Sequence, residues 1–357
     1  MGPNEQEAPG LDLPVGPRAE PMGSRGTVAN MRVTVFGAGA IGGHLGAVLS
    51  RRGAEVSLVA RGEHLEAMRS QGLRLITENE TFVTHPTVTD DPASLGAQDA
   101  VVLSLKSHQA PGAVPALQPL LGPDTVVANA MNGVPWWYFH ALPGRWENYR
   151  VRSVDPTGAL WEGIGPQRAI GCITYVASEV VEPGVIRAGG GMRYVIGEPD
   201  GSLSQRCERL RELIAPTGID VQIQTDIRSD IWVKLMGNVA LNPVSALTLA
   251  PGGSMIDDPA TETVLRRMMG EVVAVGRALG AEPAASIDSR IEGVRQGARA
   301  HKTSMLQDLE RERFMEIEPI IGAAAELGDL ANVDTPTIDT VLALVRLRAR
   351  MGGLLPT

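Results

Sequence analysis

Cysteine, aromatic residues and positive charge are all scarce in this chain of 357 residues. Its two cysteines, Cys172 and Cys207, are too few for a disulfide framework or a four-cysteine zinc site, so we expect a reducing, cytoplasmic location. Aromatic residues make up only 4% of the chain, so aliphatic side chains and methionine must fill most of the core. Lysine and arginine number 32 against 41 acidic residues, and this net charge of −9 argues against a nucleic-acid partner.

Long apolar runs and metal-binding patterns are also missing. No stretch approaches the ~18 consecutive apolar residues that span a bilayer, so we expect no membrane insertion. The six histidines show no HExxH spacing, and we expect no metal site. What remains, 43% hydrophobic and 20% charged residues, is typical of a globular protein, and the length suggests two domains or one large one.

The first thirty residues differ from the rest of the chain. Residues 1–30 are rich in proline and glycine and contain neither a basic nor an apolar segment of a secretory signal. We therefore expect a disordered tail without chemistry over 1–30. A docking segment is the alternative reading of the same composition.

Short, largely apolar runs follow this tail. They cover residues 32–36, 55–60, 100–105 and 125–128. Strands that are apolar on both faces belong to parallel sheets covered by helices, so the pattern predicts an α/β domain over 31–224. After about residue 226 helical periodicity takes over, with expected helices over 231–241, 261–279, 286–299 and 305–327 and a helix start at Thr335-Pro336. This predicts an all-α domain over 225–350.

A glycine-rich turn joins the first expected strand to the first expected helix. It has the pattern GxGxxG and consists of Gly37, Ala38, Gly39, Ala40, Ile41 and Gly42. In this pattern the first glycine permits the tight turn, the second lets the backbone approach a pyrophosphate, and the third lets helix and strand pack closely. The amide groups of the helix N-terminus favour a phosphate. The turn therefore predicts a dinucleotide site.

The ends of the expected strands carry polar and basic side chains. An acidic residue after the second strand would hold a ribose 2′-hydroxyl, but Arg61 stands there and suits a 2′-phosphate, so we predict NADPH rather than NADH. Lys106 and Asn132 follow two further strands. Ligands bind outside the carboxyl ends of such sheets, so these two residues are expected where nicotinamide and substrate meet.

Two polar groups stand out in the helical half. Lys234, Asn238 and Asn242 recur at i, i+4 and i+8, which predicts one polar row on an otherwise apolar helix that Pro243 should end or kink. A solvated helix face is the alternative. Ser304 and Glu316 are twelve residues apart, so one continuous helix would place them roughly on one side, although Glu316 could also belong to a charged surface.

The order and spacing of these motifs resemble the ketopantoate reductases (2-dehydropantoate 2-reductases). The similarity runs from about residue 31 to 348, and its specific parts are the Lys234–Asn238–Asn242-Pro243 row and the run Ser304-Met305-Leu306-Gln307-Asp308. The resemblance implies a Rossmann-type domain followed by a helical domain like the C-terminal domain of 6-phosphogluconate dehydrogenase. It also implies NADPH as cofactor and an active site between the domains. The implied reaction converts a 2-oxo acid, with 2-dehydropantoate as leading candidate, to the 2-hydroxy acid.

The resemblance also implies a role for each site residue. Lys234 matches the general acid, and Glu316 matches an acid near the substrate hydroxyl and the nicotinamide. The expected substrate contacts are Asn132, Asn238, Asn242 and Ser304. The expected cofactor contacts are Gly37, Ala38, Gly39, Ala40, Ile41, Gly42, Arg61, Lys106, Asn132 and Ala177.

Three departures from the family pattern keep alternatives open. The connection over 135–167 is longer than usual and carries bulky aromatic residues, Gly252 stands where many members have asparagine, and the acid at position 318 is Glu rather than Asp. The alternatives are a reductase of a larger 2-oxo acid or imine, and a non-catalytic NADP(H)-binding regulatory module. The apolar helices of the second domain also make a homodimer an expectation.

Overall fold

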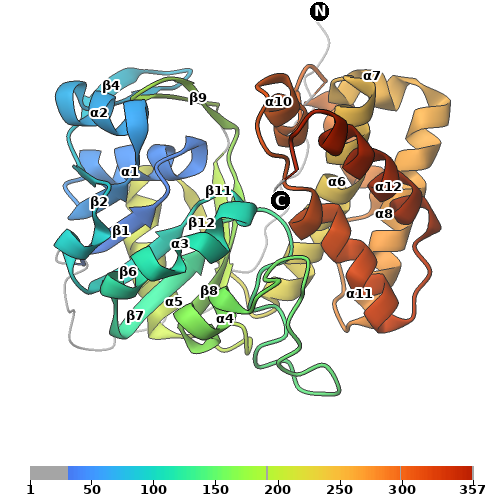
Figure 1. The fold of residues 1–357 in the computed structure, drawn as a ribbon, viewed down its shortest axis with the longest axis horizontal. Helices are drawn as coiled ribbons and strands as arrows, with labels where there is room; N and C mark the ends of the chain where they lie inside the picture. Colours follow the sequence, from blue (N-terminus) through green and yellow to red (C-terminus); the bar gives the residue numbers. More distant parts are fainter. Residues whose placement is uncertain (1–30, 190–191, 298, 356–357) are drawn as a thin grey trace, which may run out of the picture.

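A computed structural model describes residues 31–189, 192–297 and 299–355. The expected tail over 1–30 lies outside these residues. Figure 1 shows two parts side by side, one built on a sheet and one built of helices. Strands end with β12 (Asp220–Ile223), and helix α6 (Ile227–Thr248) follows. The predicted fold class, a Rossmann-type part followed by a helical part, is confirmed.

An eight-stranded sheet forms the centre of the first part. Its order is β12-β11-β8-β7-β6-β1-β2-β5. The pairings from β5 to β8 are parallel, whereas β11 is antiparallel to β8. The remaining bounds are β1 Val33–Phe36, β2 Val56–Val59, β5 Thr87–Thr89, β6 Gln98–Leu103, β7 Leu121–Asn129, β8 Ala169–Tyr175 and β11 Arg193–Gly197. The chain leaves β1 towards β2 and returns to β6 on its other side, which creates a switch point between β1 and β6.

Helices and a second, smaller sheet cover this centre. The smaller sheet has the order β4-β3-β10-β9, and helix α1 lies between it and the large sheet. Its strands are β3 Leu73–Ile76, β4 Thr81–Thr84, β9 Ser178–Glu182 and β10 Val185–Ala188. The helices are α1 Ala40–Arg51, α2 Gly62–Gln71, α3 Ala110–Leu117, α4 Ala159–Ile164 and α5 Gln205–Ile214.

Helix α6 is the central element of the second part, where it packs against α8, α10 and α12. Aspartates cap two of the helices, since Asp226 accepts from Ser229 N (3.1 Å) and Asp258 from Thr261 N (2.7 Å). The other bounds are α7 Gly252–Asp257, α8 Pro259–Ala278, α9 Ile287–Gln296, α10 Ser304–Glu310, the π-helix η7 Glu318–Gly322, α11 Ala323–Ala331 and α12 Pro336–Met351. None of the helices described here is both long and apolar enough to cross a membrane.

The structure corrects two expectations about helices. Of the two outcomes expected at Pro243, an end or a kink of the helix, the end does not occur, because α6 continues to Thr248. The apolar side chains that α6 buries around the proline offset the lost backbone hydrogen bond, which costs ~3 kcal/mol. The helix expected over 305–327 is interrupted after Glu310, where Glu312 adopts a φ of +53°. Tertiary contacts replace helical ones there, since Met315 N donates to Leu354 O at 3.2 Å.

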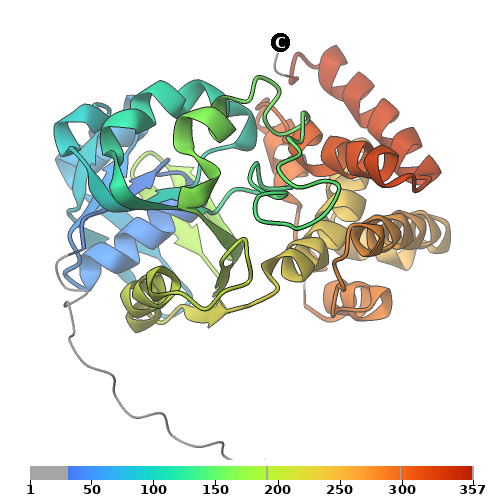
Figure 2. The same cartoon turned by 90° about the horizontal axis from the view of Figure 1, so that it is seen from below.

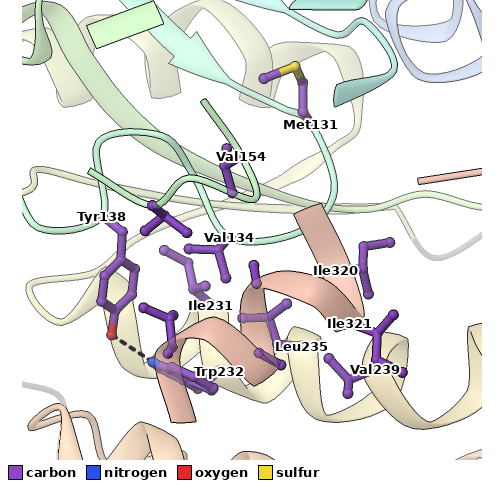
Figure 3. Close-up of a cluster of buried hydrophobic side chains, with 14 of the residues drawn as sticks. Met131, Val134, Tyr138, Val154, Ile231, Trp232, Leu235, Val239, Ile320 and Ile321 are labelled. Carbon is purple, nitrogen blue, oxygen red and sulfur yellow. Dashed lines mark hydrogen bonds between the residues drawn. The ribbon is translucent and has the colours of Figure 1, made fainter. Parts of the chain in front are cut away.

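The long connection after β7 packs between the two parts. Its aromatic run Trp136-Trp137-Tyr138-Phe139 is buried, and Trp232 Nε1 on α6 donates to Tyr138 Oη at 2.6 Å. Figure 3 shows Tyr138, Val134 and Val154 from this connection facing Ile231 and Leu235 of α6. Figure 2 shows the same connection bridging the sheet part and the helical part. The aromatic residues therefore form part of the interface between the two parts.

Candidate active site

The glycine-rich turn has the geometry that a dinucleotide needs. Gly37 adopts a φ of +106°, which favours glycine, and a Cβ on Gly42 would lie 2.1 Å from the carbonyl oxygen of Gly37. A Cβ on the exposed Gly39 would meet nothing within 4 Å. Two glycines are thus required by the fold, whereas Gly39 leaves free approach to the N-terminus of α1. The turn fits a bound pyrophosphate.

The other predicted cofactor contacts lie near the carboxyl ends of neighbouring strands. Arg61 is exposed and immediately precedes α2, just after β2. Lys106 follows β6, and Asn132 follows β7, where its backbone oxygen accepts from Ser107 Oγ at 2.9 Å. Ala177 is exposed between β8 and β9, and its carbonyl accepts from Gly189 N at 2.9 Å. The fold therefore brings Arg61, Lys106 and Asn132 to one edge of the sheet.

Lys234 lies on α6 where that helix meets the end of β8. Its Nζ donates to the carbonyl oxygen of Thr174 at 2.9 Å. Burial lowers the pKa of Lys234 from 10.5 to about 8, while the carboxylate of Glu316 opposes this fall and the charge of Arg290 adds to it. An amine with this pKa can give up a proton close to neutral pH.

A cavity opens beside Lys234, between the ends of the strands, the aromatic connection and α6. Asn238, one turn after Lys234, lines it. Asn129 at the end of β7 also lines it, and its buried Oδ1 accepts no hydrogen bond from the residues described. Asn129 was not predicted as a site residue, and its only sequence signal was that of a polar residue ending an apolar strand. The residues around the cavity include Asn129, Met131, Trp137, Cys172, Lys234 and Asn238.

An ion-pair network crosses from the sheet part to the helical part. Lys106 Nζ lies 2.5 Å from Asp308 Oδ2 and 3.3 Å from Glu316 Oε2. Glu316 Oε1 also accepts from Ser107 N at 2.9 Å and from Ser107 Oγ at 3.1 Å. Both carboxylates are buried, and they hold the loop after β6 against the helical part.

The charges in this network influence one another. Burial acts to lower the pKa of Lys106, but the carboxylates of Glu316 and Asp308 outweigh it, so the pKa is raised. Burial raises the pKa of Asp308, and Lys106 opposes that rise. Asp308 had no assigned role in the sequence analysis, although it closes the Ser304–Asp308 run. The spacing along a helix could not show that it faces a lysine 202 residues earlier.

Asn242 and Ser304 occupy the region where α6 meets α10. Asn242 is buried and its backbone oxygen accepts from Ser245 Oγ at 2.9 Å. Ser245 Oγ in turn hydrogen-bonds to Thr303 Oγ1, which caps α10 by accepting from Leu306 N at 3.2 Å. Ser304 is the first residue of α10 and is half-buried. The polar row of α6 and the start of α10 are therefore neighbours.

A parallel sheet with a dinucleotide turn, facing a lysine and amides on a second part, defines the class: an NAD(P)-dependent oxidoreductase. Residues 33–201 match the family described as ketopantoate reductase PanE/ApbA, and residues 226–349 match its C-terminal domain. The chain belongs to the ketopantoate reductase family. The family and the oxidoreductase class predicted from the sequence are confirmed.

Individual relatives cover nearly the whole described chain. A 2-dehydropantoate 2-reductase from Mesorhizobium japonicum is 48% identical over 317 residues, which are 88% of this chain and 97% of that protein. A solved structure from Ralstonia solanacearum MolK2 is 38% identical, with a TM-score of 0.86 over 91% of this chain and 99% of that one. A PanE/ApbA family ketopantoate reductase from Ralstonia eutropha JMP134 is 28% identical, with a TM-score of 0.78 over 90% of this chain and 100% of that one.

Proposed function

We propose that this chain reduces 2-dehydropantoate to pantoate with NADPH. The observation that carries the proposal is Lys234, whose ammonium group has a pKa of about 8 beside a cavity that Asn238 also lines. The name of the Mesorhizobium relative supports the choice of substrate. In this proposal residues 31–224 bind the nucleotide, and residues 225–350 supply the helical half of the substrate site.

The residues of the first part hold the cofactor. The turn from Gly37 to Gly42 and the N-terminus of α1 hold the pyrophosphate, and Arg61 takes the 2′-phosphate. Lys106, Asn132 and Ala177 lie towards the nicotinamide half. When bound, NADPH supplies the hydride that reduces the carbonyl carbon of the substrate.

The residues of the second part act on the substrate. Lys234 stabilises the negative charge that develops on the carbonyl oxygen and gives it a proton. Asn132, Asn238, Asn242 and Ser304 fix the substrate against the nicotinamide. Glu316 lies near the new hydroxyl and also anchors Ser107 and Lys106, as its hydrogen bonds to both residues support.

A panel of carbonyl substrates tests this function. NADPH oxidation is followed with 2-dehydropantoate, with larger 2-oxo acids and with imines. The highest kcat/KM for 2-dehydropantoate is expected. A higher value for a larger 2-oxo acid or an imine would overturn the substrate assignment, and tight NADPH binding without turnover of any compound would instead favour a regulatory module.

Two further properties stay predictions. A homodimer through the helical part is supported by Leu344 and Leu347 of α12, which are 51% and 50% exposed and lie three residues apart. Sedimentation equilibrium of the purified protein measures this assembly. A cytoplasmic location is supported by the free, buried thiols of Cys172 and Cys207.

Arg61→Ala is expected to weaken NADPH binding by about 1–3 kcal/mol and to leave NADH binding nearly unchanged. The reason is that the guanidinium contacts only the 2′-phosphate, which NADH lacks. Dissociation constants for both cofactors are measured by fluorescence titration. Arg52→Ala serves as the control, because it removes the same charge from an exposed residue at the far end of α1. An equal loss for both cofactors, or a wild type that prefers NADH, would refute the assignment of Arg61.

Gly39→Ala is expected to weaken dinucleotide binding, whereas Gly42→Ala is expected to lower the stability of the fold. The Gly39 variant should keep the wild-type thermal midpoint and lose affinity for the dinucleotide, because its Cβ enters open space where the pyrophosphate approaches. The Gly42 variant should lose ~1–3 kcal/mol of stability even without cofactor, because its Cβ would overlap the oxygen of Gly37. Thermal unfolding with and without NADPH separates the two, and full NADPH affinity in the Gly39 variant would place the pyrophosphate elsewhere.

A further inference from the structure

An arginine from outside the predicted site reaches the helix that carries Lys234. Arg290 lies on α9 and extends over α6 at Gly237, where an added Cβ would lie 2.2 Å from Nη2 and 3.2 Å from Cζ of the arginine. Gly237 is three residues after Lys234, and residues at this spacing are neighbours on a helix surface. The guanidinium therefore occupies the α6 surface beside Lys234, in space that only glycine leaves free.

This guanidinium has no anionic partner among residues 31–189, 192–297 and 299–355. Its Nε is buried and makes no hydrogen bond there. The neighbouring acids of α9 are taken by other arginines: Asp288 pairs with Arg266 at 2.6 Å, and Glu292 pairs with Arg295 at 3.0 Å. Because a desolvated donor without an acceptor costs free energy, the arrangement calls for an anion from outside the chain.

Other positive charges gather around the same place. At the end of β8, the ring centroid of Tyr175 lies 4.4 Å from Arg193 Cζ and 6.0 Å from Lys234 Nζ. Burial raises the pKa of Tyr175, and the charges of Arg290 and Arg193 act against that rise. Two acids act on these cations. Burial raises the pKa of Asp230 and Arg193 opposes that rise, whereas Glu316 opposes the fall in the pKa of Lys234. Three cations against these two acids favour an anionic ligand.

We infer that Arg290 binds the carboxylate of the 2-oxo acid while Lys234 holds the adjacent carbonyl oxygen. This inference rests on the proposed function, because it needs a 2-oxo acid in the site. The two groups of such a substrate are on neighbouring carbon atoms, which matches cations on neighbouring positions of one helix surface. A planar guanidinium can take both carboxylate oxygens at once. Arg290 then makes the enzyme prefer acids to neutral carbonyl compounds.

The test compares a 2-oxo acid with its methyl ester in the full-length enzyme. In Arg290→Gln, kcat/KM for the acid should fall roughly 10- to 100-fold, as expected for a lost charge-assisted hydrogen bond, whereas kcat/KM for the ester should stay within about twofold. Arg290→Lys should recover part of the loss, since it keeps the charge and loses the planar fork. The NADPH dissociation constant should not change.

Arg295 provides the matched control for Arg290. Arg295→Gln makes the same change on the same helix at an exposed, ion-paired position, and it should retain wild-type values for both substrates. If Arg290→Gln loses acid and ester activity equally, Arg290 is structural and the inference is wrong. If the wild type reduces no 2-oxo acid, the proposed function fails. If the wild type is active and Arg290→Gln leaves the ratio of kcat/KM for acid to kcat/KM for ester unchanged, the role of Arg290 is refuted while the proposed function stands.

Discussion

Replacing Lys234 by methionine is expected to lower kcat by ~10²–10⁴-fold and to leave the NADPH dissociation constant unchanged, because general acid catalysis is worth about that much. Methionine keeps the length and apolar stem of the side chain and removes only the proton donor. Steady-state kinetics and fluorescence titration measure the two quantities. The variant should be at least as stable as the wild type at pH 7, because a desolvated ammonium group is removed. The fall in kcat is then not caused by loss of folded protein.

The pH profile assigns the proton donor independently. Burial places the pKa of Lys234 at about 8, so the ammonium form is lost as pH rises through that value and wild-type kcat should decline there. The methionine variant should lack this alkaline limb. Lys106 cannot produce it, because Glu316 and Asp308 raise the pKa of Lys106 and keep it charged. A variant that retains full kcat and the same limb would exclude Lys234 as the acid.

Asn238→Ala supplies the contrast on the same helix. Asn238 lines the same cavity one turn further along. In the proposed function it orients the substrate and does not donate the proton. Its loss should appear mainly in KM, with the alkaline limb intact. If both variants lost kcat to the same extent and with the same pH profile, the two roles would not be separable and the assignment of Lys234 would fail.

The parts of the fold that could be predicted are those set by local pattern. The GxGxxG turn lies between a buried strand and a helix, and its glycines meet steric demands within a few residues of themselves, such as that of Gly42 on Gly37. The i, i+4 spacing likewise placed Lys234 and Asn238 on one helix face. These features depend on backbone geometry that a short segment determines.

What could not be predicted depends on contacts between distant segments. Glu316 was expected on a continuous helix, but its carboxylate pairs with Lys106 and Ser107, and the chain leaves the helix before it. Pro243 remains inside α6 because that helix is surrounded by other helices. Arg290 had no sequence signal, since only the packing of α9 against α7 and α8 lets its side chain reach Gly237 of α6. The roles of such residues depend on partners that are distant in the sequence, and no spacing pattern links a residue to a partner of this kind.

Lys106→Met is expected to destabilise the protein by about 1–3 kcal/mol at pH 7, because it leaves the buried carboxylates of Asp308 and Glu316 without their cation. A fully buried pair would lose ~3–5 kcal/mol, but the Lys106 side chain is 35% exposed and solvent screens part of the effect. Chemical denaturation of wild type and variant at pH 7 and pH 5 measures the difference. NADPH binding should weaken as well, since Lys106 is a proposed cofactor contact.

The pH dependence of this loss separates electrostatics from packing. Burial already raises the pKa of Asp308 in the wild type, and removing Lys106 removes the charge that opposes the rise. A carboxyl group whose folded pKa exceeds its unfolded value takes up its proton first in the folded state, so the stability of the variant is regained as pH falls. The difference in stability between variant and wild type should therefore narrow from pH 7 to pH 5.

Lys302→Met is the control. It removes an exposed lysine 2.6 Å from Glu310 and should lower the stability by at most ~1 kcal/mol. A Lys106→Met loss as small as that control, or one that does not change with pH, would show that the network does not hold the two parts together by charge.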